Sequence, residues 1–276
     1  MTEQFRPRGF SLLPTVVKNL LIINVLVFLA QWIAEAKFGI KLEESFGLHY
    51  PPSLAFKPWQ FITYMFLHGN FTHLFFNMFA LWMFGYALEN IWGPKRFLSY
   101  YFITGIGAAL VQCLVMYLNI NPTIDLLNGW IANPDAKTIP SLLNQLSVDI
   151  RYMPQNYQEA INILKSNPDN KQALLLVKDF LIYFRENFMN QFVVIGASGA
   201  VYGILLAFGM IFPNTLIYIY FLFPLKAKYF VIIYGVIELI SGLSGASSNV
   251  AHFAHLGGMV FGFFLILYWK KKGRLY

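Results

Sequence analysis

Six runs of apolar residues, each close to the length that a bilayer requires, dominate this sequence. A hydrocarbon core of about 30 Å needs about 20 apolar residues in helical form. No water in that core can hydrogen-bond an open strand edge, so each run is expected to be a helix. The six predicted spans are residues 19–34, 71–88, 97–118, 192–212, 229–243 and 253–269.

Composition supports a membrane protein rather than a nucleic-acid-binding one. Of the 276 residues, 57% are hydrophobic and only 12% are charged, whereas a soluble domain has about 25% charged residues. The net charge of +7 comes from basic residues that lie mostly at the ends of apolar runs, where they indicate topology. The single cysteine, Cys113, excludes an internal disulfide and a C-x-x-C metal site. The predicted partners are therefore the lipid bilayer and membrane proteins, with no nucleic acid.

The distribution of basic residues predicts the orientation. With the N-terminus inside, short inner segments hold eleven of the twenty lysines and arginines. Short loops determine orientation, whereas long loops count little. We therefore expect a multi-pass protein of the cell (inner) membrane with both termini in the cytoplasm. The eleven residues are Arg6, Arg8, Lys18, Lys95, Arg96, Lys226, Lys228, Lys270, Lys271, Lys272 and Arg274.

One segment, residues 119–191, differs from the rest because acids and bases are both frequent in it. Between residues 173 and 188 its apolar residues recur at helical spacing. The predicted organisation is residues 1–118 for the N-terminus and spans one to three, 119–191 for an extracytoplasmic insertion of amphipathic helices, and 192–276 for spans four to six with a basic tail. The predicted fold class is all-α, a polytopic bundle of six transmembrane helices with this insertion outside the membrane.

Histidines gather at the outer ends of two spans. His68 and His73 precede or begin the second span, and His252 and His255 begin the sixth. A histidine within a span is costly and indicates function, although any one alone fits a packing hydrogen bond. His73 and Asn77 are four residues apart and share one helical face. Two donors on one face suit a developing anion.

The fourth span carries a serine between small residues. Gly196 and Gly199 flank Ser198, and glycine permits close backbone approach. If the helix begins here, Ser198 lies at an N-terminus that favours negative charge; ordinary small-residue packing is an equal alternative. The stretch is not the G-x-S-x-G elbow of soluble hydrolases, because Ala200 replaces the last glycine.

The sixth span carries His255 and the G-x-x-x-G pair Gly258 and Gly262. Close helix approach through these glycines would bring His255 to Ser198, and an alcohol nucleophile needs such a base. No aspartate lies in any span, and Glu238 is expected to reach water at the end of the fifth. A dyad is therefore predicted rather than a triad. Tyr202, one turn after Ser198, is expected to stack on the imidazole.

These motifs resemble the rhomboid family of intramembrane proteases. They are His73-x-x-x-Asn77, Gly196-x-Ser198-Gly199 and Ala254-His255-x-x-Gly258, with Glu89-x-x-x-Gly93 after the second span. The resemblance implies a serine endopeptidase that cleaves transmembrane segments through an acyl-enzyme, without metal or cofactor. It also implies lateral substrate access between the second and fifth spans. By that resemblance Ser198 is the nucleophile, His255 the base, His73, Asn77 and the Ser198 N–H the oxyanion site, and Gly196, Gly199, Tyr202 and Gly258 supporting residues.

Departures and alternatives remain. Trp59 is followed by Gln60 rather than by the arginine that the family places in its first outer loop, and the insertion exceeds the family's short loop. A catalytically inactive relative that binds membrane proteins is the main alternative. A zinc protease would use the four clustered histidines, but no H-E-x-x-H motif is present. A transporter could use Glu238 for protons.

Overall fold

The computed structural model describes residues 11–219, 222–244 and 251–273. It divides the chain into two compact units. The first consists of the residues up to Leu48, of Lys57–Cys113, and of the residues from Val193. The second consists of His49–Phe56 and Leu114–Phe192. The boundary falls inside a long helix, α5 (Pro94–Ala132). The predicted topology residues Arg6, Arg8 and Arg274 lie outside the described residues.

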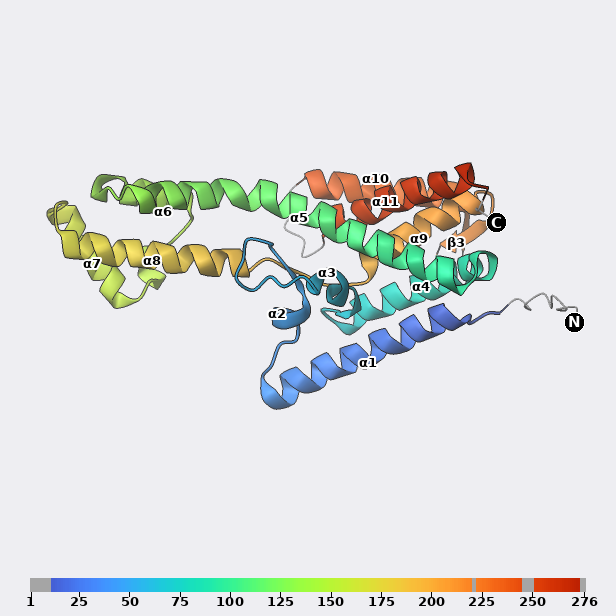
Figure 1. Ribbon diagram of the computed structural model, residues 1–276. Coiled ribbons are helices and arrows are strands. Elements are labelled where there is room, and N and C mark those ends of the chain that lie inside the picture. The colour runs from blue at the N-terminus through green and yellow to red at the C-terminus, as the bar shows by residue number, and fades with distance from the viewer. Residues whose placement is uncertain (1–10, 220–221, 245–250, 274–276) are drawn as a thin grey trace, which may run out of the picture. The chain divides into compact units, whose positions relative to one another are not determined.

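The first unit holds the apolar helices (Figure 1). Helix α9 packs against α4, α10 and α11, and α1 packs against α4. The long helices are α1 (Thr15–Phe38), α4 (Phe71–Trp92), the first part of α5, α9 (Ser198–Ile211), α10 (Ala227–Leu243) and α11 (His252–Lys271). The short elements are α2 (Glu43–Phe46), α3 (Gln60–Thr63), η1 (Tyr64–Phe66), β2 (Val193–Val194), β3 (Leu216–Ile219) and β4 (Phe223–Lys226), with β1 (Leu48–His49) at the unit boundary.

The second unit is a small helical assembly whose helices α7 and α8 pack together (Figure 1). The apolar spacing of α8 buries one face, including Val177 and Leu181, as the periodicity predicted. Asn170 caps α8, because its side chain accepts a hydrogen bond from the backbone N–H of Ala173. Beside the second part of α5, the elements are η2 (Ala136–Thr138), α6 (Ile139–Gln145), η3 (Ile150–Tyr152), α7 (Gln155–Ser166) and α8 (Lys171–Asn190).

The helices of the first unit present apolar side chains outward. Trp32, Phe76 and Phe264 are each more than 60% exposed, which would be a liability in water but suits lipid. Within the described ranges, α1, α4, α5 and α11 are long and apolar enough to cross a membrane. The chain is therefore an all-α polytopic membrane protein, as predicted from the apolar runs.

Two element boundaries and one strand pair differ from the sequence-based expectation. The predicted fourth span starts at Phe192, but α9 begins only at Ser198 because Gly196 adopts a left-handed φ of +127°. The third predicted span ends at Leu118, but α5 continues through Pro122 to Ala132. Loss of apolarity marks where a helix leaves the lipid, not where its hydrogen bonding ends. The antiparallel pair β3 and β4 was not predicted.

Candidate active site

Ser198 is the first residue of α9. The turn at Gly196 that precedes it is held by a hydrogen bond of 2.9 Å from the Gly196 N–H to the carbonyl of Tyr64. A side chain at Gly196 would be strained at its φ and would meet the His73 ring at 2.9 Å. The helix start therefore puts the Ser198 hydroxyl where backbone N–H groups favour a developing negative charge.

Helices α9 and α11 pack against each other. A Cβ atom built on Gly258 would lie 1.8 Å from the carbonyl oxygen of Gly199, so any other residue at position 258 would force the helices apart. This approach brings together the two side chains that the sequence paired. The Nε2 atom of His255 lies 2.7 Å from the Oγ atom of Ser198, and His255 is buried.

Tyr202 covers the imidazole of His255. The two rings are parallel within 6°, with centroids 4.2 Å apart. Tyr202 lies one turn after Ser198 on α9, so a single helix presents both the hydroxyl that His255 contacts and the ring on which it stacks. The structure thus places Tyr202 where the sequence expected it.

Glu238 on α10 is buried, with 7% of its surface exposed, so the expectation that it reaches water is wrong. The hydroxyl of Tyr202 donates a hydrogen bond to its Oε1 atom. Its Oε2 atom lies 2.6 Å from Nδ1 of His252 and 3.0 Å from Nδ1 of His255. Sequence reasoning missed this cluster, although an acid inside a span was a signal that could have found it.

His73 and Asn77 lie on α4 beside the serine turn. A Cβ atom at Gly196 would lie 2.9 Å from the His73 ring and 3.6 Å from the Oγ atom of Ser198. The His73 ring and the Ser198 hydroxyl therefore both lie close to Gly196. Asn70 caps α4 by accepting a hydrogen bond of 2.8 Å from the His73 N–H. The side-chain amide of Asn77 is buried and donates to the carbonyl of His73 at 2.9 Å. Both candidate oxyanion donors are therefore on one helical face, as their spacing predicted.

His68 is also buried, and its ring meets that of His73 edge to face at 5.0 Å. Its backbone is fixed by Gln31 on α1, whose side-chain oxygen accepts from the His68 N–H at 3.0 Å. His68 therefore packs behind His73 rather than with His252 and His255, and the four histidines considered for zinc divide into two pairs.

A different trio has metal-ligating atoms close together. Atoms of Glu238, His252 and His255 lie within 4.8 Å of one another. A zinc ion holds its nitrogen and oxygen ligands at about 2.0–2.2 Å in a tetrahedron, which separates ligand atoms by more than 3 Å. The 2.6 Å contact of His252 with Glu238 is shorter than that separation and fits a hydrogen bond.

Glu89 supports the helix frame at the other end of α4. It is buried, and its carboxylate accepts hydrogen bonds from the N–H groups of Val16 and Val17 at 2.9 and 2.8 Å. These are orphan donors in the first turn of α1, and a carboxylate there also complements the helix dipole. Gly93 follows with a φ of +76° that ends α4.

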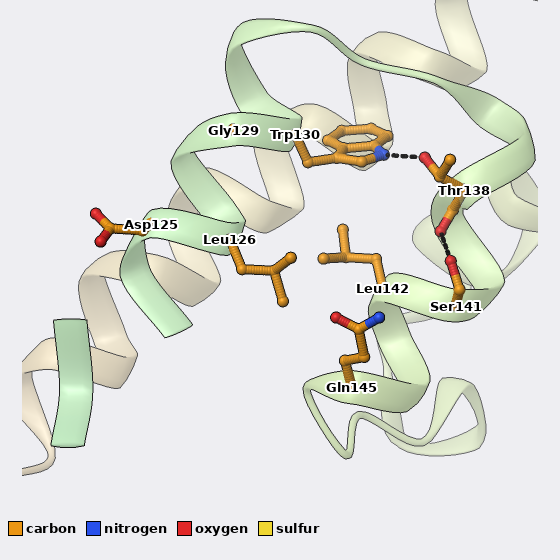
Figure 2. Close-up of a pocket in the computed structure, with 8 residues that line it drawn as sticks. All are labelled: Asp125, Leu126, Gly129, Trp130, Thr138, Ser141, Leu142 and Gln145. Carbon is orange, nitrogen blue, oxygen red and sulfur yellow. Dashed lines mark hydrogen bonds between the residues drawn. The ribbon is translucent and has the colours of Figure 1, made fainter. Parts of the chain in front are cut away.

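A pocket of about 410 Å³ lies in the second unit, between the end of α5 and α6 (Figure 2). The indole N–H of Trp130 donates to the Thr138 hydroxyl at 3.1 Å, and Ser141 donates to the Thr138 carbonyl at 2.8 Å. Its polar groups thus pair locally, and Leu126 faces Leu142 across it (Figure 2). No nucleophile–base pair lines it among the described residues.

Comparison with known proteins agrees with these motifs. The Rhomboid domain family matches residues 55–124 and 174–272. The rhomboid protease AarA of Providencia stuartii is 33% identical over 37% of this chain and 38% of its own length. An uncharacterized mitochondrial rhomboid protein of Schizosaccharomyces pombe is 26% identical over 78% of this chain and 52% of its own.

The rhomboid protease GluP of Bacillus subtilis is 39% identical over 20% of this chain and 11% of its own length. The matched part of the chain thus spans between about a tenth and about a half of these relatives. The family match covers more than half of the chain and leaves out residues 125–173, the middle part of the segment that the sequence marks as an insertion. This chain therefore belongs to the rhomboid family.

Proposed function

We propose that the protein is an intramembrane serine endopeptidase that cleaves transmembrane segments of membrane proteins. Ser198 is the nucleophile and His255 the general base. The observation that carries this proposal is the 2.7 Å separation of Ser198 Oγ and His255 Nε2. An alcohol attacks poorly until an adjacent base accepts its proton. The relatives named rhomboid proteases support the same activity.

The length of α9 supports chemistry inside the bilayer. Its 14 residues correspond to about 21 Å at 1.5 Å per residue, less than the hydrocarbon thickness of about 30 Å. If the end of α9 at Ile211 reaches the inner surface, Ser198 lies below the outer surface. A polar site there needs protein shielding from lipid, which the burial of His255, Asn77 and Glu238 supports.

The reaction follows from the geometry. Ser198 Oγ attacks the scissile carbonyl carbon while His255 Nε2 takes the hydroxyl proton. The resulting oxyanion is stabilised by the Ser198 N–H, His73 and Asn77, whose amide must first leave the His73 carbonyl. The proton then passes from Nε2 to the leaving nitrogen, and an acyl-enzyme remains. Water, deprotonated by the same imidazole, attacks the acyl carbonyl, and the imidazole returns that proton to Ser198 Oγ as the ester C–O bond breaks. These steps need no metal or cofactor.

Substrate reaches the site laterally, between α4 and α10. These helices meet through Phe84 and Phe230, whose ring centroids are 6.3 Å apart. Asn77 and Glu238 lie further along the same two helices. A substrate helix that unwinds readily is favoured, because its backbone must extend to present a carbonyl to Ser198.

Cleavage of a fluorescent single-span reporter by the full chain in proteoliposomes tests this function. Wild type is expected to cleave, and Ser198→Ala and His255→Ala to fall to background, with unchanged thermal unfolding. Ser244→Ala, at an exposed serine just after α10, is the matched control and should cleave normally. Equal cleavage by wild type and Ser198→Ala would contradict the proposal. Binding of the reporter without cleavage by wild type would instead favour the catalytically inactive relative.

We also propose that both termini are cytoplasmic and that the insertion is extracytoplasmic, in a cell inner membrane. In a Cys113→Ser background, an impermeant maleimide added to intact cells should label Lys171→Cys in the insertion but not Lys95→Cys in the first turn of α5. Both lysines are exposed. The reverse labelling would invert the topology.

A further inference from the structure

The least expected feature of the first unit is a buried carboxylate behind the base. Glu238 lies on α10, outside every motif that identified the site, and 7% of its surface is exposed. A carboxylate buried without partners would be strongly disfavoured. Its partners are therefore informative, and all of them belong to the two helices, α9 and α11, that carry Ser198 and His255.

Each oxygen of this carboxylate contacts a residue of the site. Oε1 accepts a hydrogen bond from the hydroxyl of Tyr202, the residue stacked on His255. Oε2 lies 2.6 Å from Nδ1 of His252 and 3.0 Å from Nδ1 of His255. The nitrogen of His255 that faces Glu238 is the one opposite to Nε2, which contacts Ser198.

We propose that Glu238 is a positioning residue that extends the Ser198–His255 pair to a Ser198–His255–Glu238 triad. This rests on the proposed protease function and deepens it. The sequence analysis predicts a dyad without an acid, so this triad differs from that expectation. Along the chain its residues occur in the order serine, acid, histidine. The same roles, with serine, histidine and a carboxylate in line, have arisen on unrelated folds, so geometry rather than sequence position defines them.

The carboxylate acts without taking a proton. With Nδ1 protonated and facing Oε2, Nε2 is left unprotonated and ready to accept the Ser198 proton as the Oγ–carbon bond forms. The imidazolium that results lies against a negative charge. When the scissile C–N bond breaks, the Nε2 proton goes to the leaving nitrogen and the neutral imidazole returns. Throughout, the proton on Nδ1 stays there.

The contact is close but not yet aligned. Nδ1 of His255 lies within ion-pair distance of Oε2 without the direction of a full hydrogen bond. Such contacts commonly tighten when substrate binds. The groups that face His255 are Ser198 and Tyr202 from α9, Glu238 from α10 and His252 from α11, with His73 from α4 beyond Gly196. Glu238 is the only acid among them.

His252 shares the same oxygen. It therefore holds the carboxylate from the side opposite to Tyr202, so that Glu238 has fixed orientation. This gives a role to His252, the histidine of the His252-x-x-His255 pair that the serine chemistry leaves unused. The alternative, a metal ion held by the trio, conflicts with the 2.6 Å contact between His252 and Glu238, because two ligands of one zinc ion lie more than about 3 Å apart.

The test compares Glu238→Gln, which keeps the shape and removes the charge, with Glu238→Asp, which keeps the charge. The matched control is Glu89→Gln, a second buried glutamate that caps α1. Each full-length variant is measured in proteoliposomes with the single-span reporter for kcat, KM and their pH profile. Ser198→Ala in the same assay reports on the proposed function separately.

Glu238→Gln should lower kcat by about 100-fold or more, with KM changed by less than about threefold because substrate binding is intact. The acidic limb of its profile should move to lower pH, by roughly one unit, because a neutral amide no longer favours a protonated imidazole. Glu238→Asp should retain more activity than Glu238→Gln, and the acidic limb of its pH profile should lie where that of wild type lies. In Glu89→Gln, the acidic limb of the pH profile should stay where it is in wild type, whatever the effect of this substitution on stability.

Three outcomes would overturn the triad while Ser198→Ala still shows a serine protease. The first is a kcat of Glu238→Gln within about threefold of wild type. The second is an equal loss in Glu238→Gln and Glu238→Asp with no movement of either pH profile, which indicates packing alone. The third is loss of wild-type activity with a chelator and recovery with Zn²⁺, which indicates a metal site. Equal cleavage by Ser198→Ala and wild type would remove the proposed function itself.

Discussion

Two carboxylates of this protein make the same short contact in opposite surroundings. Glu238, in the first unit, lies 2.6 Å from a His252 nitrogen, and Asp149, in the second, lies 2.6 Å from an Arg151 nitrogen. The Glu238 side chain is 9% exposed, whereas those of Asp149 and Arg151 are 35% and 83% exposed. A contact between exposed charges is screened by water and contributes little. Distance alone therefore does not indicate function; burial and a reactive neighbour do.

One helical glycine from each unit gives a second comparison. Gly258 in α11 faces the Gly199 carbonyl so closely that no side chain fits, whereas Gly129, also in a helix but in the second unit, has no atom within 4 Å of a Cβ position. The first unit uses glycine to bring two helices together. The second has a glycine that its packing does not require.

Among the substitutions that test this comparison of the two units, Gly258→Ala should have the largest effect. The added methyl meets a backbone oxygen, so α9 and α11 must separate and the Ser198–His255 contact lengthens. A displacement of about 1 Å can cost about 100-fold in rate, and overpacking about 1–3 kcal/mol in stability. Reporter cleavage and thermal unfolding measure the two.

Gly129→Ala is the matched control for that substitution. It should leave cleavage unchanged and alter stability by no more than about 1 kcal/mol, in the stabilising direction, because alanine favours a helix over glycine. Similar losses of cleavage and stability in both variants would mean that the close approach of α9 and α11 does not explain the difference between the two glycines.

Acidification should affect the first unit before the second. A protonated His255 cannot accept the Ser198 proton, so cleavage should fall about tenfold per pH unit on the acidic limb. In the second unit, hydrogen bonding by Arg151 lowers the pKa of Asp149 below its ordinary value of 3.8. Any stability from that depressed pKa is present above the ordinary value and is lost only as the pH falls through the lowered one.

Along the acidic limb of the cleavage profile, therefore, activity should decline while the helical circular dichroism and the unfolding temperature stay constant. Parallel loss of structure along that limb would show that unfolding, not protonation of the base, inactivates the protein.

Tyr202→Ala should lower kcat by about tenfold, or about 1.4 kcal/mol of transition-state free energy, because both the stack on His255 and a donor to Glu238 are lost. Tyr202→Phe keeps the ring and should fall between wild type and alanine. Tyr183→Ala, at an exposed tyrosine of α8, should cleave as wild type does. A Tyr202→Ala enzyme with unchanged kcat would indicate that Glu238 alone orients the imidazole.

The smallest effect is expected for Asp149→Asn. Because the ion pair with Arg151 is open to solvent, the unfolding temperature should change by less than about 2 °C, with cleavage unaffected. A large destabilisation would show that the second unit depends on this pair more than its exposure suggests.

The sequence by itself determined the class of fold and indicated most residues of the candidate site. Apolar length requires helices because lipid offers the backbone no hydrogen bonds. The spacing of His73 from Asn77 and of Ser198 from Tyr202 fixed shared helical faces, because the helical repeat is constant. The small residues Gly199 and Gly258 indicated which helices approach. All of these signals are local in the chain.

Only the tertiary structure decided the surroundings of those residues. The sequence predicts a water-exposed Glu238, because a residue near the end of a predicted span can usually reach the surface. Its burial depends on the packing of α10 against α9 and α11, which no local pattern encodes. The start of α9 at Ser198 likewise depends on the Gly196 φ and its bond to Tyr64. Periodicity determines which face a side chain shares, and packing determines what that face meets.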